Sequence, residues 1–182
     1  MNDAAAAATL PSIRDAAPAD LAGIAAIYAH HVLTGLGTFE ETPPTVEEMT
    51  RRHADVVGRG LPWIVAVAPP GGTLGYAYAA PYRLRSAYRY TLEDSIYVAP
   101  TALRHGVGLA LLHALVERCT VAGYRQMIAI IGDSDNRASI GVHSRAGFAR
   151  IGVMPGVGHK HGRWVDCVVM QRTLGSGDGA PP

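Results

Sequence analysis

The chain has 182 residues, of which 48% are hydrophobic and 17% are charged, and its formal net charge at pH 7 is +1. That length and apolar content are enough for one domain with a substantial core. The nearly neutral charge balance argues against a protein that binds nucleic acid or a membrane surface, because such proteins concentrate basic charge. No apolar run in the sequence reaches the length that spans a bilayer.

The cysteines and the chain ends indicate the compartment and the domain limits. Cys119 and Cys167 lie far apart inside apolar segments, which is typical of buried thiols in a reducing compartment. The alanine run near the N-terminus lacks the basic and hydrophobic regions of a secretory signal, so we expect a cytoplasmic protein. We expect disordered tails over residues 1–10 and 175–182 around a single domain over residues 11–174.

The spacing of apolar residues alternates between helix and strand values along this domain. In chain order it predicts a strand over 12–15, helices over 18–32 and 45–57, strands over 63–68, 74–80 and 90–98, a helix over 106–122, a strand over 127–131, a helix over 137–146, and strands over 149–153 and 164–174. Thr45 and Glu48 have the spacing of a capping box. The last two strands are expected to be joined by a long glycine- and histidine-rich connection. The order predicts an α/β domain with a mixed sheet and helices on both faces.

The most informative segment runs from the strand over 90–98 through the turn Arg104-His-Gly-Val-Gly108 into a helix. A helix start presents free N–H groups and a partial positive charge, which suit a phosphate or pyrophosphate. Gly106 and Gly108 let an anion approach the backbone, with Arg104 and His105 at the entrance. A tight turn that simply needs glycine is the alternative. Because no third glycine or Gly-Lys-Ser/Thr follows, ATP, GTP and NAD are poor candidates.

Glu93, on the strand before this turn, is the candidate general base. An alkylammonium cannot attack a thioester until it loses a proton, and a nearby carboxylate can accept that proton. Strand alternation puts Glu93 on the same side as Ser95 and Tyr97, and a solvated strand glutamate is the alternative. An anion site beside a proton acceptor suggests group transfer from a phosphate-bearing carrier.

Four motifs then follow one another between Ile13 and Leu174. They are Arg85-Ser-Ala-Tyr88 with Thr91-Leu-Glu-Asp-Ser-Ile-Tyr-Val98, Leu103-Arg-His-Gly-Val-Gly108, Asn136-Arg-Ala-Ser139 with His143-Ser-Arg-Ala-Gly-Phe148, and Gly158-His-Lys-His-Gly-Arg-Trp-Val-Asp166. As a set they resemble the GNAT superfamily of acetyl-CoA-dependent N-acetyltransferases, and within it the phosphinothricin and methionine sulfoximine acetyltransferase family. Leu103 departs from the Gln or Arg usual at its position. The resemblance implies the GNAT fold, with a mostly antiparallel mixed sheet.

The resemblance also implies roles for individual residues. Glu93 falls on the family's catalytic glutamate, and His143 stands where many members carry a tyrosine that may protonate the departing thiolate; a satisfied, half-buried histidine is the alternative for His143. Binding of acetyl-CoA is implied for Ile96, Tyr97, Val98, Arg104, His105, Gly106, Val107, Gly108, Leu109, Asn136 and Ser139. An N-cap of the helix over 137–146 is a second interpretation of Asn136, and both can hold.

The acceptor site is expected around Phe39, Arg83, Arg85 and Tyr88. Arginine binds a carboxylate or phosphinate through two hydrogen bonds, which suits an amino-acid-like acceptor. Solvated arginines and ordinary core aromatics are the alternatives. His159 and His161 have no third ligand at useful spacing, so we expect no metal site.

The expected function is acetylation of the primary amine of a small acceptor, of the phosphinothricin or methionine sulfoximine/sulfone type, by direct attack on acetyl-CoA. Acetylation of a protein N-terminus or a polyamine is one alternative, and a CoA-binding sensor that has lost catalysis is another. The arginines at 83, 85 and 89 favour an anionic acceptor over a polyamine, and Glu93 favours an enzyme over a sensor. The resemblance further implies a homodimer, for which the apolar C-terminal strands offer a surface.

Overall fold

The computed structural model describes residues 11–69 and 71–181, so the tail expected over residues 1–10 lies outside the described residues. The strands are β1 (Ser12–Asp15), β2 (Trp63–Val67), β3 (Thr73–Pro81), β4 (Thr91–Val98), β5 (Gln126–Gly132), β6 (Ala149–Lys160) and β7 (Arg163–Thr173). The helices are α1 (Leu21–Thr34), α2 (Val46–Gly58), α3 (Val107–Val121) and α4 (Arg137–Arg145). Every element expected from the apolar spacing is therefore present.

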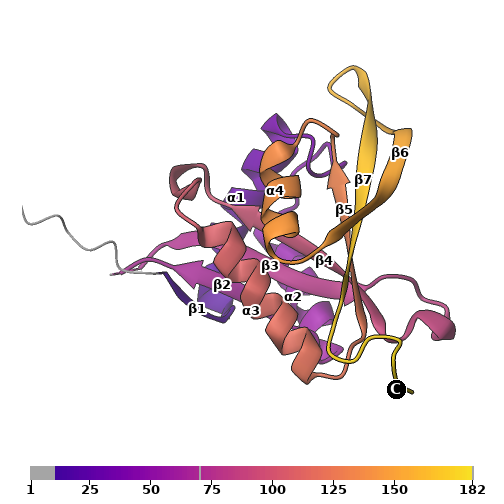
Figure 1. Cartoon of the computed structure of the whole chain (residues 1–182). Coiled ribbons are helices and arrows are strands. Elements are labelled where there is room, and N and C mark those ends of the chain that lie inside the picture. The colour runs from indigo at the N-terminus through magenta and orange to yellow at the C-terminus, as the bar shows by residue number, and fades with distance from the viewer. Residues whose placement is uncertain (1–10, 70, 182) are drawn as a thin grey trace, which may run out of the picture.

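The strands form one sheet in the order β1-β2-β3-β4-β5-β7-β6. All neighbouring strands are antiparallel except β4 and β5, so the sheet is mixed and mostly antiparallel, as expected. Helices α3 and α4 cover one face, and α1 and α2 cover the other (Figure 1). The core lies on both faces of the sheet. Leu111 and Leu115 of α3 are buried on one face, and Ile24 and Tyr28 of α1 are buried on the other.

The two parallel strands diverge in the middle of the sheet. β4 pairs with β5 only from Thr91 to Glu93, although β4 continues to Val98 and β5 to Gly132. β3 stays paired with β4 as far as Val98, and β7 stays paired with β5 as far as Gly132. A gap therefore opens between β4 and β5 beyond Glu93, at the centre of the sheet, where part of the main chain of β4 is left without a strand partner.

The connection expected between the last two strands is wrong. β6 continues to Lys160, and the turn consists of only His161 and Gly162, whose φ angles are +50° and +74°. The glycines that suggested a loop are accommodated within the strand instead, because the register with β7 shifts between Met154 and Gly158. The result is the long β6–β7 hairpin that extends beyond the rest of the sheet in Figure 1.

The capping box predicted for the start of α2 is only half formed. Thr45 caps α2 as expected, since its hydroxyl accepts a hydrogen bond from the N–H of Glu48 at 3.2 Å. The Glu48 carboxylate does not complete the box and instead binds Arg51 and Arg52.

Residues 175–181 follow β7 as a turn and bends. Among the described residues, no helix is both long and apolar enough to cross a membrane.

Candidate functional site

The edge of β4 that faces the gap carries main-chain groups without a strand partner. The N–H of Ala99 donates to Leu74 at 2.8 Å and the N–H of Tyr82 donates to Thr91 at 3.2 Å, so odd-numbered residues of this segment bond to β3. The alternation of an antiparallel pair then directs the N–H and C=O groups of Asp94, Ile96 and Val98 away from β3, toward β5. Because β5 has already diverged, these groups, apart from the C=O of Val98, which binds His31, are main-chain donors and acceptors that the gap presents to a bound molecule.

The start of α3 lies beside this edge. A Cβ built on Gly108 would come within 3.5 Å of Val98 and 3.9 Å of both Ile96 and Val142. The first N–H that bonds within the helix is that of Ala110, which donates to Gly106 at 3.0 Å. The N–H groups of residues 107–109 therefore precede the helical ladder and can bind an anion.

The turn that leads into α3 has the backbone shape that the sequence required. Gly106 is the N-cap, with φ +78°, a conformation that favours glycine. Arg104 also has a positive φ, +64°, and both Arg104 and His105 are exposed to solvent at the mouth of the helix. The exposed arginine and the free N–H groups give this corner a positive potential.

The start of α4 forms the other side of the gap. Asn136 is the N-cap of α4, because its Oδ1 accepts a hydrogen bond from the N–H of Ser139 at 3.1 Å. Its Nδ2 is held only by a 3.5 Å contact to the carbonyl of Gly132, so this donor is available. The residues of β4, α3 and α4 expected from the sequence therefore lie around this gap, which is called the cleft below, and their donors suit a diphosphate and an amide-bearing arm.

Glu93 lies on the opposite face of β4, toward α1 and α2. The register with β3 is unbroken along β4, which confirms that Glu93 shares a face with Ser95 and Tyr97. Its carboxylate is partly buried, and burial together with the negative charge of Asp94 raises its pKa above the usual value, while the positive charge of Arg83 opposes the rise. A carboxylate with a raised pKa is suited to accepting a proton near neutral pH.

His143 lies on the α3 and α4 side and is buried. Its Nδ1 is 2.8 Å from the carbonyl oxygen of Ser139, and its Nε2 is 3.0 Å from Oδ2 of Asp94. Burial lowers its pKa, but the hydrogen bond to Asp94 and the charge of Asp94 outweigh burial, and the net shift is upward. Both ring nitrogens are engaged, as in a satisfied buried histidine, and the general-acid role stays a prediction.

The expected acceptor residues occupy two separate places. Arg83 and Arg85 are exposed on the segment between β3 and β4, with the guanidinium of Arg83 5.1 Å from the Tyr82 ring centroid. Tyr88 contacts the Tyr82 ring edge-on, with centroids 5.7 Å apart. Phe39 lies instead on the segment between α1 and α2, where its ring packs against Gly158 of β6. The acceptor assignment of these four residues stays a prediction.

The contacts of two residues in this region were not predicted: His31 had no distinguishing signal in the sequence, and Lys160 stood only as a member of the Gly158–Asp166 motif. His31 of α1 reaches β4 and places its Nε2 2.9 Å from the carbonyl oxygen of Val98. Lys160 is buried at the end of β6 and donates from Nζ to the carbonyl of Thr38 at 2.8 Å. Only the tertiary fold reveals these contacts, because each partner lies more than sixty residues away in the chain.

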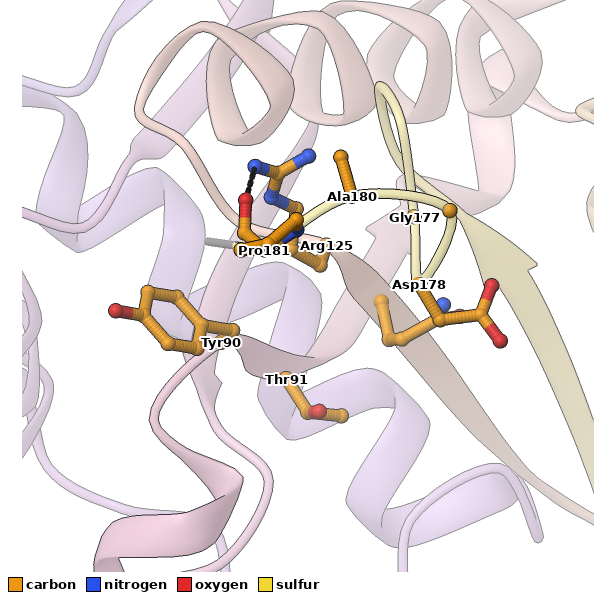
Figure 2. A pocket seen from close by; sticks show the side chains of 9 residues that line it. Tyr90, Thr91, Arg125, Gly177, Asp178, Ala180 and Pro181 are labelled. Carbon is orange, nitrogen blue, oxygen red and sulfur yellow. Dashed lines mark hydrogen bonds between the residues drawn. The ribbon is translucent and has the colours of Figure 1, made fainter.

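Two surface cavities lie outside the cleft. The larger, of about 520 Å³, is at the opposite end of β4, where Tyr90, Thr91 and Arg125 face the turn over residues 177–181. Figure 2 shows Arg125 pointing toward the tail, with its guanidinium donating to the carbonyl of Pro181 at 3.3 Å. The smaller, of about 250 Å³, is lined by Trp63, Tyr78 and Ala80 among others, and Ala80 is the direct cross-strand neighbour of Glu93.

Comparisons with known proteins identify the family of the chain. The Acetyltransferase (GNAT) family matches the chain over residues 24–148. The chain is 53% identical over 176 residues to a phosphinothricin N-acetyltransferase of Alcaligenes faecalis, which covers 97% of this chain and 87% of that protein. It is 41% identical over 170 residues to an L-methionine sulfoximine/L-methionine sulfone acetyltransferase of Pseudomonas aeruginosa, with 93% of this chain and 98% of that protein covered.

A solved structure gives the same answer for the fold. The crystal structure of a GNAT superfamily phosphinothricin acetyltransferase from Sinorhizobium meliloti, in complex with AcCoA, matches with a TM-score of 0.92 and 47% sequence identity, and the match covers 96% of this chain and 94% of that one. Among the described residues there is no group of three or more His, Cys, Asp and Glu side chains that could hold a metal ion. The chain belongs to the acetyltransferase (GNAT) family and is an N-acetyltransferase whose acetyl donor is acetyl-CoA.

Proposed function

We propose that this enzyme acetylates the primary amine of a small amino-acid-like acceptor of the phosphinothricin or methionine sulfoximine/sulfone type, with Glu93 as the general base. The observation that carries the proposal is the position of Glu93. It is a partly buried carboxylate with a raised pKa, on the strand whose open edge forms one wall of the cleft. The relatives named above act on acceptors of this type.

The residues that would bind acetyl-CoA come from three elements, β4, α3 and α4. The N–H groups of residues 107–109, with Arg104 and His105 beside them, would hold the diphosphate. The main chain of residues 96–98 would bind the pantetheine arm and orient the thioester carbonyl, with Asn136 and Ser139 opposite. When bound, acetyl-CoA supplies an activated acetyl group as a thioester.

Glu93 prepares the acceptor amine. An amine at neutral pH is protonated and cannot act as a nucleophile, so Glu93 takes a proton from the ammonium group, directly or through one water molecule. The raised pKa of Glu93 brings its basicity closer to that of neutral solution. Arg83 and Arg85 bind the anionic group of the acceptor, and Tyr88 and Phe39 are the proposed aromatic walls of its pocket.

A panel of acceptors tests this function most directly. Thiol release from acetyl-CoA is measured with phosphinothricin, methionine sulfoximine, methionine sulfone, free amino acids, polyamines and peptides with a free N-terminus. The proposal expects the highest kcat/KM for the first three compounds. Highest turnover with polyamines or peptides would replace the acceptor class, and tight binding of CoA without turnover on any amine would favour the sensor.

The Arg85→Ala variant tests how the acceptor is oriented. Loss of one charge-assisted contact to an anion corresponds to about a tenfold or larger change in binding. We therefore expect the KM for the acceptor to rise by about tenfold or more, while the KM for acetyl-CoA changes far less. Equal effects on both values would remove Arg85 from the acceptor site.

We also propose that two copies associate through β6. This strand ends the sheet, so its outer edge offers main-chain groups for pairing. β6 and the start of β7 also expose large apolar side chains of the kind found at interfaces: Ile151, Val153, Met154, Val157 and Trp164. Light scattering should give the mass of a dimer for the wild type and of a monomer for Val157→Asp; a monomeric wild type would contradict the proposal.

A cytoplasmic location is the remaining part of the proposal. Cys119 and Cys167 are both free and buried, as expected of thiols kept in a reducing compartment. Fractionation of cells that produce the protein tests this location, and recovery of the enzyme from the periplasmic or secreted fraction would contradict it.

A further inference from the structure

One buried pair of titratable groups has no part in the proposed chemistry. The side chains of His143 and Asp94 are 3% and 1% exposed, and the Nε2 of His143 lies 3.0 Å from Oδ2 of Asp94. Oδ1 of Asp94 is buried without a hydrogen-bond partner among the described residues. The edge of the Phe148 ring packs against the imidazole, with ring centroids 5.1 Å apart. A buried pair of this kind is costly to form, so its position in the fold is informative.

The neighbours of the His143 ring determine how many protons it carries. Nδ1 faces the carbonyl oxygen of Ser139 at 2.8 Å, and this oxygen can only accept a hydrogen bond. Nε2 faces the Asp94 carboxylate, which when ionised also only accepts. A neutral imidazole has one N–H. With that N–H on Nε2 toward Asp94, Nδ1 would face the Ser139 carbonyl oxygen at 2.8 Å, and only the longer contact to the Ser139 hydroxyl, at 3.4 Å, could donate to it. The geometry therefore favours a proton on both ring nitrogens, or a proton on Asp94.

The pair lies at the closed end of the cleft. β4 and β5 are paired up to Glu93, so Asp94 is the first residue of β4 beyond that pairing. His143 lies one helical turn after Ser139 on α4. The hydrogen bond therefore ties α4, which carries Asn136 and Ser139, directly to the strand that forms the opposite wall of the cleft.

We propose that Asp94 and His143 form a proton-holding clasp that positions α4 against β4 and so sets the width of the acetyl-CoA cleft. Asp94 and His143 are positioning residues in this view, which is an alternative to the general-acid role predicted for His143, and neither exchanges a proton with the substrates. The inference rests on the proposed function in one respect, since it takes the cleft between β4, α3 and α4 to be the site of acetyl-CoA.

The clasp has a pH dependence of defined sign. The pKa of His143 is raised above its ordinary value of 6.5, so the charge-assisted contact is present at lower pH and weakens to a neutral Nε2–H hydrogen bond as the pH rises through the raised value. The other titratable groups near the pair do not reverse this sign. Glu93 lies on the opposite face of β4, and Cys119 of α3 stays a neutral thiol because burial, aided by Asp94, raises its pKa to about 12. The affinity for acetyl-CoA should therefore weaken on the alkaline side.

Two substitutions of Asp94 separate the contact from its titration. Asp94→Ala removes the partner of His143, and we expect the Kd for acetyl-CoA to rise by about tenfold, or about 1.4 kcal/mol. The kcat at saturating substrates should fall by less than about threefold, because Glu93 is untouched. In Asp94→Asn, the amide can donate to Nε2 of a neutral ring while Nδ1–H keeps its bond to Ser139. This variant should bind within about threefold of wild type at pH 7 and should lose the alkaline weakening.

Calorimetric titration with acetyl-CoA from pH 6 to 9.5 measures these effects, with Glu117→Gln on the exposed side of α3 as the control. Ring ¹⁵N NMR spectra of the two proteins provide a second readout that survives if Asp94→Ala does not fold. They should show two protonated nitrogens on His143 in the wild type at pH 7 and one in Asp94→Asn.

The outcomes also separate this inference from the proposed function. Wild-type affinity and pH profile in both Asp94 variants, or a neutral His143 beside an ionised Asp94 in the wild type, would overturn the clasp. Gly108→Glu puts a negative charge at the start of α3 and should greatly weaken acetyl-CoA binding. If Gly108→Glu binds normally, the assignment of the cleft fails; if it binds weakly while the Asp94 variants behave as wild type, only the clasp fails.

Discussion

Glu93 and Asp94 are adjacent carboxylates on one strand, yet their surroundings differ completely. Glu93 points toward α1 and α2, is partly exposed, and receives no hydrogen bond from any residue of the described ranges 11–69 and 71–181. Asp94 points toward α3 and α4, is buried, and binds His143. The difference shows how strand alternation assigns two identical functional groups to different tasks. One face of β4 keeps a carboxylate free to exchange protons, and the other uses a carboxylate to hold the fold.

The largest expected effect comes from Glu93→Gln. An amide cannot accept the ammonium proton, so kcat/KM at neutral pH should fall by about 10²–10⁴-fold, the usual contribution of a general base. Affinity for acetyl-CoA should be unchanged, because the side chain lies on the other face of β4. Steady-state kinetics and calorimetry measure the two quantities separately.

The pH profile sharpens this prediction. In the wild type, activity should decline as the pH falls through the raised pKa of Glu93, because the base becomes protonated. Glu93→Gln should lack this limb and should recover activity as the pH approaches the pKa of the acceptor amine itself. If Glu93→Gln and Asp94→Asn gave the same kinetic signature, the contrast between the two faces would be wrong.

The sequence predicted more of the cofactor side than of the acceptor side, for a physical reason. A phosphate-binding helix start is a local feature, encoded in Gly106 and Gly108 and in the apolar spacing that follows. The period of a strand likewise determined the face of Glu93. By contrast, the contact of Asp94 with His143 joins residues 49 positions apart, and no local pattern distinguishes a buried His–Asp pair from two polar residues.

The wrong connection in the C-terminal hairpin has a similar origin. Glycines at 156, 158 and 162 read as a loop because glycine weakens isolated strands. In the fold, Phe39 packs where a side chain at Gly158 would lie, a shift in register accommodates Gly156, and Gly162 lies in the turn itself. Gly158 is therefore the residue that lets β6 approach Phe39.

A smaller effect is expected from Lys160→Met. This substitution tests how much the Lys160–Thr38 contact stabilises the α1 side of the sheet, where Glu93 lies. The chain's single lysine is buried and holds Thr38, whose hydroxyl in turn lies 2.8 Å from that of Tyr28 on α1. Removing the donor leaves the Thr38 carbonyl without its partner, which costs about 1–3 kcal/mol. Urea denaturation should show this loss of unfolding free energy, and the exposed Arg150→Met should show none. Unchanged stability would mean that this contact does not hold the segment.

His31→Ala should act more weakly and on the cleft. The Nε2–H of His31 binds the carbonyl of Val98, and burial lowers the pKa of this histidine, so the neutral ring is the donor. Loss of one neutral hydrogen bond is worth about 0.5–1.5 kcal/mol. We therefore expect the Kd for acetyl-CoA to rise by about two- to tenfold. His30→Ala is the matched control, because the adjacent imidazole is exposed and contacts only its own helix; equal effects of both substitutions would exclude a specific role for His31.

Arg83→Gln should raise the acceptor KM as Arg85→Ala does, because both arginines are proposed to bind the acceptor anion. Its smallest effect, on the pH profile, tests the electrostatic environment of Glu93 directly. The positive charge of Arg83 lowers the pKa of Glu93 against the stronger effect of burial, so its removal should raise that pKa further. The acid limb of kcat/KM should then move to higher pH, by about half a unit or less, because Arg83 is exposed and solvent screens its charge. The shift should disappear at about 1 M salt, where the Debye length is about 3 Å. Arg89→Gln, on the same segment but stacked on Tyr90, should leave the limb in place. A shift to lower pH in Arg83→Gln would show that Arg83 does not act on Glu93 through its charge.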